Sequence, residues 1–227
     1  MVKIKYRVEN KYIVTESLLK ILEHRLKNIM KCDIHQKDDS YTVKSLYFDD
    51  VFNTCLESNE AGINDRKKYR IRTYDNGVDS LNLEVKEKRN GFTHKNICPI
   101  TIEEYKKILK NEFFVCSDRA PLNELFLQNR LNKMGPVIII EYERTAFVHN
   151  SGNVRITFDR NIRVNHNVSC FLKDSSIGLL PVLPSGLHIL EVKYDEFLPD
   201  VIYEQLELKN LKQTPFSKFY YGRLLRS

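Results

Sequence analysis

The stretch that decides the fold is RKKYRIRTY at residues 66–74. Successive side chains of a β-strand point to opposite faces, so a strand here carries a run of cations on one face. These cations are Arg66, Lys68, Arg70 and Arg72. Like charges two residues apart on a strand repel one another, so the pattern favours an anion lying across the strand.

Three other segments alternate charged and apolar residues in the same way. They are residues 6–12 with Arg7, Glu9 and Lys11, residues 81–88 with Glu84, Lys86 and Lys88, and residues 189–194 with Glu191 and Lys193. A hairpin over residues 137–163 adds Arg144 and Arg155. One charged face on an antiparallel sheet usually means a solvated face. Several such strands in one small domain instead indicate a closed barrel whose charged faces meet in an interior channel.

Turn signals between the predicted strands indicate an antiparallel meander. They fall at residues 75–77, 89–91 and 150–153, and each contains the Asn and Gly residues typical of hairpin connections. Helices are the minority and are predicted at residues 15–31, 101–109, 121–135, 200–212 and 219–225. The helix at 101–109 opens on a capping box from Thr101 to Glu104. The fold class is therefore α+β, predominantly antiparallel β, with helices packed outside the barrel.

Composition is that of one globular domain over residues 1–227. A hydrophobic content of 42% is enough to bury a core, and the net charge of +6 points to an anionic partner. Charged residues recur from Lys3 onward and no apolar run is long enough to span a bilayer, so we expect a cytoplasmic protein without membrane insertion. The odd number of cysteines, 5, at irregular spacings predicts no disulfide framework, and the scattered histidines predict no histidine-based metal site.

A channel lined by guanidinium and ammonium groups matches phosphate oxygens. Glu9 and Glu191 lie among these cations, where a pure anion-binding groove gains nothing from them. Carboxylate and phosphate oxygens together are what Mg²⁺ or Mn²⁺ prefers, so the two glutamates are candidate metal ligands. The alternative is that each glutamate only pairs with a neighbouring lysine.

The ordered motifs resemble the polyphosphate polymerase domain of the vacuolar transporter chaperone (VTC) proteins, within the triphosphate tunnel metalloenzyme superfamily. They are Arg7-x-Glu9-x-Lys11-Tyr12, residues 45–49 with Thr54, Lys68-x-Arg70-x-Arg72-x-Tyr74, Glu84-x-Lys86, Tyr142-x-Arg144-x-x-Phe147, Arg155-x-Thr157-x-Asp159, Glu191-x-Lys193-Tyr194 and Ser217-Lys218-Phe219. Each motif is weak alone, whereas the ordered set is specific and covers nearly the whole chain.

The resemblance implies an eight-stranded tunnel that binds ATP or another nucleoside triphosphate, inorganic polyphosphate, and Mn²⁺ or Mg²⁺. Together with the charge pattern it assigns catalysis to Lys218, Arg70, Arg72 and Lys11, and the metal to Glu191 and Glu9. Substrate binding is assigned to Arg7, Lys68, Lys86, Lys88, Arg144, Arg155, Lys193 and Ser217, with Lys95 as a further candidate. Tyr47 is expected to pack in the tunnel wall. The reaction implied is transfer of the γ-phosphate of ATP to a growing polyphosphate chain.

One departure from the superfamily pattern bears on the reaction. Tunnel hydrolases typically begin with a Glu-x-Glu-x-Lys strand, and this chain has Arg7 where the first glutamate would stand. That argues against a CYTH-type adenylate cyclase or thiamine triphosphatase. The chain is also expected to lack the regulatory domain and membrane segment of the eukaryotic polymerases.

Three other functions stay open or are disfavoured. A tripolyphosphatase or nucleoside triphosphatase would use the same tunnel, and a non-catalytic polyphosphate-binding module could serve a protein partner. Nucleic-acid binding is disfavoured because aromatic residues do not interleave with the cations as stacking platforms would.

Overall fold

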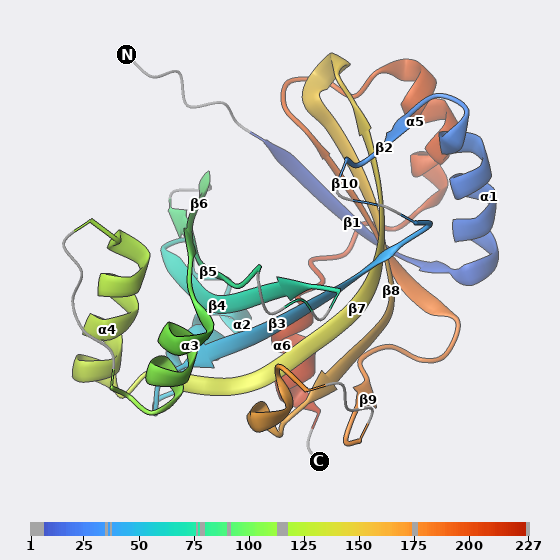
Figure 1. Ribbon diagram of the computed structural model, residues 1–227. Helices are drawn as coiled ribbons and strands as arrows, with labels where there is room; N and C mark the ends of the chain where they lie inside the picture. Colours follow the sequence, from blue (N-terminus) through green and yellow to red (C-terminus); the bar gives the residue numbers. More distant parts are fainter. Residues whose placement is uncertain are drawn as a thin grey trace. The chain divides into compact units, whose positions relative to one another are not determined.

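The computed structural model describes residues 7–34, 36, 38–75, 77, 80–89, 92–112, 118–173 and 177–225 (Figure 1). The strands are β1 (Val8–Thr15), β2 (Lys31–Cys32), β3 (Tyr41–Asp49), β4 (Arg66–Tyr74), β5 (Asn82–Arg89), β6 (Phe92–Pro99), β7 (Gly135–His149), β8 (Val154–Asn165), β9 (Leu180–Pro181) and β10 (Leu187–Tyr194). The helices are α1 (Glu16–Lys27), α2 (Thr54–Glu60), α3 (Ile102–Leu109), α4 (Ala120–Asn132), α5 (Asp200–Leu206) and α6 (Lys218–Leu224). Short 3₁₀ turns are η1 (Ser151–Asn153), η2 (Val168–Cys170) and η3 (Leu208–Asn210).

The strands form one sheet in the order β1-β10-β8-β7-β3-β4-β5-β6, with β2 paired to β7 and β9 to β8. Its ladders are antiparallel, which confirms the predicted fold class. The expected closure is not found, because no ladder joins β1 and β6 in the described part of the chain. The outer edge of β1 is instead covered locally, since Tyr12 bridges to Gln213 and Thr214 N donates to Lys11 O over 2.8 Å.

The predicted helices begin within one residue of their predicted starts. Thr15 caps α1 by accepting from Leu18 N, and the Thr101–Glu104 capping box opens α3. The helix predicted over 200–212 is shorter, because Glu207 adopts a left-handed φ of 49° that ends α5. Helix α2 was not predicted: its N-terminus is capped through the buried carboxylates of Asp49 and Asp50 rather than by a local Ser or Thr.

The chain divides into two compact units. Unit 1 comprises residues 1–42, 142–162 and 183–217, and unit 2 comprises residues 43–141, 163–182 and 218–227. Strands β3, β7 and β8 pass from one unit to the other.

In unit 1, helices α1 and α5 lie side by side against one face of the sheet (Figure 1). Leu19, Leu22 and Leu26 of α1 pack with Ile202 and Leu206 of α5 in the core. The strands contribute Tyr12, Val14, Ile156, Phe158, Leu190 and Val192 to this core. Because neighbours along a strand alternate, the residues between these apolar ones, Lys11, Thr157 and Glu191 among them, lie on the opposite face.

In unit 2, α4 lies against β5 and β6. Tyr69 and Ile71 of β4 and Leu83 and Val85 of β5 are buried. The Tyr69 hydroxyl donates to Glu124 of α4 over 2.8 Å, which identifies this as the helix-covered face. The alternate residues of β4 and β5, which include the cations predicted to bind phosphate, occupy the other face.

No helix in the described residues is long and apolar enough to cross a membrane. The cysteines the structure describes, Cys32, Cys55, Cys98 and Cys170, are free thiols, and Cys116 lies outside the described residues. The absence of a disulfide framework is thus confirmed for these four cysteines.

Candidate functional site

The cations of β4, β5 and β6 share one face of unit 2, which we call the basic face. Residues directly opposite in an antiparallel ladder project to the same side. Arg66 faces Lys88, Lys68 faces Lys86, and Lys86 faces Lys95. The basic face is defined as Arg66, Lys68, Arg70, Arg72, Lys86, Lys88 and Lys95, together with the carboxylate of Glu84.

Three lysines form a row across the basic face. Lys68, Lys86 and Lys95 are consecutive partners on β4, β5 and β6, and neighbouring strands are about 5 Å apart. Like charges directly opposite one another destabilise a sheet. A row of three such lysines therefore favours a bound polyanion that neutralises them.

Glu84 neutralises part of the basic face. Arg70 Nε donates to its Oε2 over 2.7 Å, and Lys95 Nζ lies 3.3 Å from its Oε1. Burial alone would raise the pKa of Glu84, but Arg70, Arg72 and Lys95 outweigh it and lower the pKa to about 2. Glu84 is therefore ionised at every physiological pH, as one negative charge against seven cations.

Tyr47 on β3 belongs to this network as well as to the packing that was expected. Arg70 Nη1 donates to the Tyr47 hydroxyl over 2.9 Å. Burial opposes ionisation of the phenol, yet Arg70, Arg72 and Lys68 outweigh it and lower the pKa of Tyr47 to about 8. The value reports a strongly positive local field. On the same strand, Ser45 accepts from Arg72 Nε over 3.1 Å.

Helix α6 reaches the basic face through Phe219. Its ring lies 5.2 Å from the Tyr47 ring, measured between centroids, and Lys68 Nζ lies 5.5 Å from its centroid. Lys68 also donates to Asn59 of α2. Lys218 is the first residue of α6 and directly precedes Phe219. The predicted catalytic Lys218 therefore begins a helix whose next residue contacts the basic face.

The charged face of unit 1 differs because carboxylates are nearly as numerous as cations on it, and we call it the mixed face. Glu9 of β1 faces Lys193 of β10, which faces Arg155 of β8; in the next row Lys11 faces Glu191, which faces Thr157. The mixed face is defined as Glu9, Lys11, Arg144, Arg155, Thr157, Asp159, Glu191 and Lys193.

Glu191 is the centre of the mixed face and only 5% exposed. Its carboxylate lies 3.1 Å from Lys193 Nζ, 3.7 Å from Arg144 Nη2 and 3.9 Å from Lys11 Nζ. Burial would raise its pKa, but Lys193, Lys11 and Arg144 outweigh it and hold the pKa well below its usual range. Glu191 is a buried, permanently ionised carboxylate.

Two other carboxylates hold the arginines of the mixed face. Arg144 makes a bidentate pair with Asp159, at 2.6 Å from Nε and 2.8 Å from Nη2. Arg155 pairs with Asp33 and also donates to the Tyr41 hydroxyl. Sequence reasoning missed the roles of Asp159 and Asp33. Asp159 was inside a quoted motif, whereas Asp33 stands outside every charged alternation.

Lys11 connects the mixed face to the chain just before α6. Its Nζ lies 2.9 Å from Glu9 and donates to the carbonyl of Phe216 over 3.2 Å. Burial would lower its pKa, but Glu191 and Glu9 outweigh that effect and raise it. Ser217 follows Phe216 directly, so this hydrogen bond ties Lys11 to the segment of unit 1 that carries the predicted substrate-binding Ser217.

Arg7 is not brought into the mixed face. It precedes β1 and donates to the carbonyl of Asn153, with Asp195 at 3.8 Å. These partners belong to the turn η1 and to the end of β10. The ladder of β1 starts at Val8, one residue after Arg7. The Arg7 side chain is therefore positioned by its contacts at the turn and not by the alternation of the strand.

The carboxylates of the mixed face suit a divalent metal that is shared with a phosphate. Mg²⁺ is usually bound through one or two carboxylates plus substrate phosphates, and Mn²⁺ accepts the same hard oxygen donors. Glu9 and Glu191 supply such donors on adjacent strands. Within the described ranges no group of three or more His, Cys, Asp or Glu residues is placed to hold a metal ion. The residues therefore fit a metal whose remaining ligands come from substrate.

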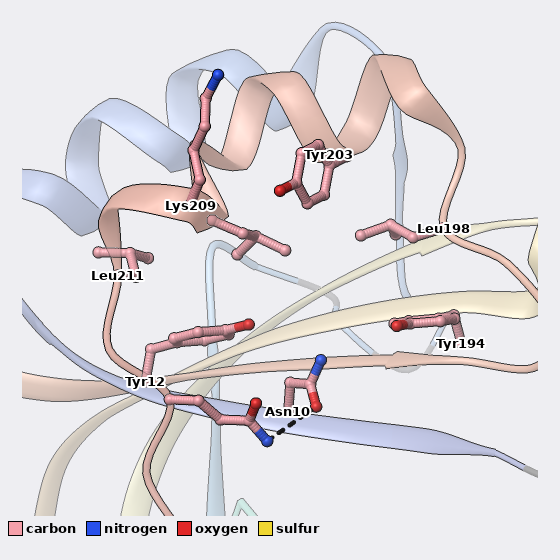
Figure 2. Close-up of a pocket in the computed structure, with 9 residues that line it drawn as sticks. Asn10, Tyr12, Tyr194, Leu198, Tyr203, Lys209 and Leu211 are labelled. Atoms are coloured by element: carbon pink, nitrogen blue, oxygen red, sulfur yellow. Dashed lines mark hydrogen bonds between the residues drawn. The ribbon is translucent and has the colours of Figure 1, made fainter.

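A cavity of about 320 Å³ lies in unit 1 but on the helix-covered face (Figure 2). Figure 2 shows Tyr12, Tyr194 and Tyr203 around it, with Leu198, Leu211 and Lys209. Lys209 is the cation among its lining residues. Its other lining residues are tyrosines, leucines, Asn10 and Gln213, so the cavity lacks the cluster of cations that phosphate requires and is not part of the candidate site.

A sequence comparison assigns the family. The family model of the VTC domain matches residues 6–225. The chain belongs to the VTC domain family. The match covers both compact units of this VTC domain. A search of curated proteins found no match.

Solved structures share the fold of this VTC domain. One is a putative adenylate cyclase from Bacillus halodurans, with a TM-score of 0.54 and 13% identity, over 94% of this chain and 94% of that chain. Another is a putative adenylyl cyclase from Hippeastrum described as having a dominant triphosphatase activity, with a TM-score of 0.54 and 14% identity, over 97% and 95%. At this identity the likeness establishes that the VTC domain shares the fold of these two proteins and says nothing of its reaction.

Proposed function

We propose that this VTC domain is a cytoplasmic polyphosphate polymerase, a single functional domain that works on a nucleoside triphosphate and inorganic polyphosphate. The terminal oxygen of the polyphosphate chain attacks the γ-phosphorus of ATP. A new P–O–P bond forms as the bond to the β-phosphate breaks, so that ADP leaves and the chain grows by one phosphate.

The excess of positive charge on the basic face carries this proposal. Lys68, Lys86 and Lys95 stand in one row, and Glu84 is the single carboxylate of the defined face. Phosphate oxygens match both the fork of arginine and the compact ammonium of lysine. A polyanion with a charge on every phosphate relieves the repulsion along the whole row. Arg66 and Lys88 extend the same face for a longer chain.

The lowered pKa of Glu191 favours phosphoryl transfer to a polyphosphate chain over transfer to water. A general base works best when its pKa is near the operating pH, whereas Lys193, Lys11 and Arg144 hold the pKa of Glu191 well below its usual range against the effect of burial. Attack by water needs a proton acceptor, but the end of a polyphosphate chain is already anionic. Phosphoryl transfer then depends on positioning and charge neutralisation.

Glu191 and Glu9 would hold Mn²⁺ or Mg²⁺ in the loaded protein. The bound cation would supply further neutralisation of phosphate charge. The chain's own groups orient the phosphates: Arg70 and Arg72 on the basic face, Lys11 and Lys193 on the mixed face, and Lys218 at the start of α6.

A hydrolase that uses the same residues is the second candidate. The Hippeastrum protein of the same fold is described as having a dominant triphosphatase activity. In that case water would replace the polyphosphate acceptor and orthophosphate would be released. A polyphosphate-binding module that serves a protein partner would give neither product.

The test is incubation of the purified protein with ATP and Mn²⁺ or Mg²⁺, with polymer resolved on a gel and orthophosphate measured in parallel. We expect polymer from the wild type, and a loss of at least ~100-fold in Lys218→Ala and Glu191→Ala, comparable to the loss of one electrostatic contact in a transition state. Lys209→Ala, at the cavity on the helix-covered face, is the matched lysine control and should retain full activity. Orthophosphate without polymer would replace the polymerase with the hydrolase, and tight polyphosphate binding without either product would make the chain a binding module.

A further inference from the structure

The short helix α6 is fixed to unit 2 at both of its ends. It has seven residues, so it is too short to be stable by itself. Near its start, Phe219 packs on Tyr47 and Lys68 of the basic face. One residue before its end, Arg223 binds Asp49 at the end of β3 and Asn53, the N-cap residue of α2. The contacts of Phe219 and Arg223 therefore help to set the position of the helix that begins with Lys218.

The contact at Arg223 joins three elements. Arg223 Nη1 donates to Asp49 Oδ2 over 3.2 Å, and its Nη2 donates to Asn53 Oδ1 over 2.6 Å. The Arg223 guanidinium also lies 5.8 Å from the Phe219 ring, a favourable cation–π distance. The planar fork of arginine can bind Asp49 and Asn53 together, whereas lysine offers one point charge.

Asp49 is itself held rigidly. Its side chain is fully buried, and its carboxylate accepts from the backbone amides of Asp50, Cys55 and Leu56 at 2.8 to 3.2 Å. The carboxylate that caps α2 thus also anchors α6. Because Asp49 ends β3, the strand that carries Tyr47, the anchor and the basic face belong to one continuous piece of backbone.

Gly222 in α6 is packed so closely against neighbouring strands that a larger side chain does not fit. A Cβ at Gly222 would lie 2.7 Å from Val164 Cγ1 and 3.3 Å from Ile138 Cδ1. Glycine at this position lets the helix approach β7 and β8 closely. Helix α6 therefore cannot slide to compensate for a lost contact at Arg223 without losing this packing.

We propose that Arg223 is a positioning residue that acts through Lys218 on the substrate. The inference rests on the proposed function. In this proposal Arg223 does not contact phosphate. Its hydrogen bonds to Asp49 and Asn53 fix α6, so that Lys218 contacts the substrate near Lys68. A misplacement of about 1 Å costs up to ~100-fold in rate when a positioned group loses its geometry.

A double-mutant cycle on the full chain tests the inference, with Arg223→Gln, Lys218→Ala and the double variant. We expect Arg223→Gln to lower kcat at least ~10-fold with a change in KM of less than about twofold, because uniform binding is retained. The double variant should be no slower than Lys218→Ala, since residues that act through one another are not additive. Arg223→Lys should restore little activity. Arg130→Gln, an exposed arginine on α4 that loses the same charge, is the control and should behave as wild type.

Melting temperatures of all variants separate positioning from folding. If Arg223→Gln is as active as the wild type while Lys218→Ala is impaired, the inference is overturned and the proposed function stands. Additive losses in the double variant would also overturn it, since they indicate an independent structural role. If the wild type releases orthophosphate and makes no polymer, the same cycle is run on kcat for hydrolysis and the same non-additivity is required; a wild type that only binds tripolyphosphate would overturn the inference. A wild type that neither reacts nor binds would overturn both the proposed function and this inference.

Discussion

Arg70 on β4 and Glu84 on β5 are directly opposite in the ladder, and the Arg70 Nη2 to Glu84 Oε2 distance is 2.5 Å. Glu84 is 2% exposed and also pairs with Lys95. This single carboxylate therefore limits how much positive charge the basic face offers to an anion. It also links two strands that carry like-charged facing pairs at Arg66 and Lys88 and at Lys68 and Lys86.

Replacing Glu84 by glutamine should strengthen anion binding and weaken the fold. One added net charge is worth roughly 1 kcal/mol at about 4 Å in water-like surroundings, so tripolyphosphate affinity should rise about fivefold at low salt. Loss of a charged hydrogen-bond partner should lower the free energy of unfolding by about 1.5–3 kcal/mol. Titration calorimetry and urea unfolding measure the two effects. Glu87→Gln, on the opposite face of the same strand beside Lys67, is the matched control; equal affinities for the two variants would contradict the prediction.

The stabilising effect of Glu84 should depend on pH in the acid range. Its folded-state pKa of about 2 lies below the ordinary 4.5, so the unfolded chain binds the proton more readily. The contribution is then fully present above about pH 4.5 and is lost as the pH falls toward 2. The difference in unfolding free energy between wild type and Glu84→Gln should shrink over this range. A difference that stays constant from pH 6 to about pH 3 would show that the pair is not ionic.

Tyr47 should report occupancy of the basic face. In the free protein its phenol has a pKa of about 8, because Arg70, Arg72 and Lys68 outweigh burial. Bound phosphate screens these cations, so tripolyphosphate should raise the pKa of Tyr47 toward the ordinary 10. By linkage, affinity for tripolyphosphate should fall as the pH rises above 8. Ultraviolet difference absorbance of tyrosinate measures the titration. The step should vanish in Tyr47→Phe and persist in Tyr69→Phe, and a step unmoved by tripolyphosphate would place the anion elsewhere.

Glu191→Gln tests whether Glu191 is a metal ligand or only an ion-pair partner of the neighbouring cations. Without the carboxylate, Lys193, Lys11 and Arg144 keep their charge, so metal-free binding of tripolyphosphate should strengthen. If Glu191 holds the metal, the additional affinity conferred by Mn²⁺ on the wild type should be lost in the variant. Calorimetry with and without a chelator measures both terms, and Asp195→Asn at the Arg7 turn is the control. Retention of the full Mn²⁺ effect would remove Glu191 from the metal site.

Gly222→Ala should perturb α6 without any change of charge. The new Cβ would approach Val164 Cγ1 to 2.7 Å, and overpacking of this kind typically costs about 1–3 kcal/mol. We expect a lower melting temperature together with reduced activity. Gly186→Ala is not a suitable control because of its φ of +77°, whereas Gly135, where an added Cβ would meet nothing within 4 Å, provides a matched Gly→Ala variant. Equal melting temperatures for the two variants would contradict the close packing of α6.

Sequence periodicity was sufficient to assign the charged faces of the strands. Alternation predicted β4 at residues 66–74 with its true ends, and the side-chain period of two placed Arg70 and Arg72 together. The ordered motifs were sufficient to indicate the VTC family. Local capping chemistry predicted the start of α3, because a cap involves only neighbours in the sequence.

Only the tertiary structure decided which charges meet. The register made Lys68, Lys86 and Lys95 one row, and it set Glu84 against Arg70, because ladder hydrogen bonds and not periodicity choose the facing residue. It placed Arg7 with Asp195 at a turn and excluded it from the mixed face. The hydrogen bond from Arg223 to Asp49 joins residues 174 positions apart, and no local sequence pattern predicts such a contact. The sequence alone determined which charges each strand carries, while long-range packing determined which of them face one another and how far carboxylates balance them.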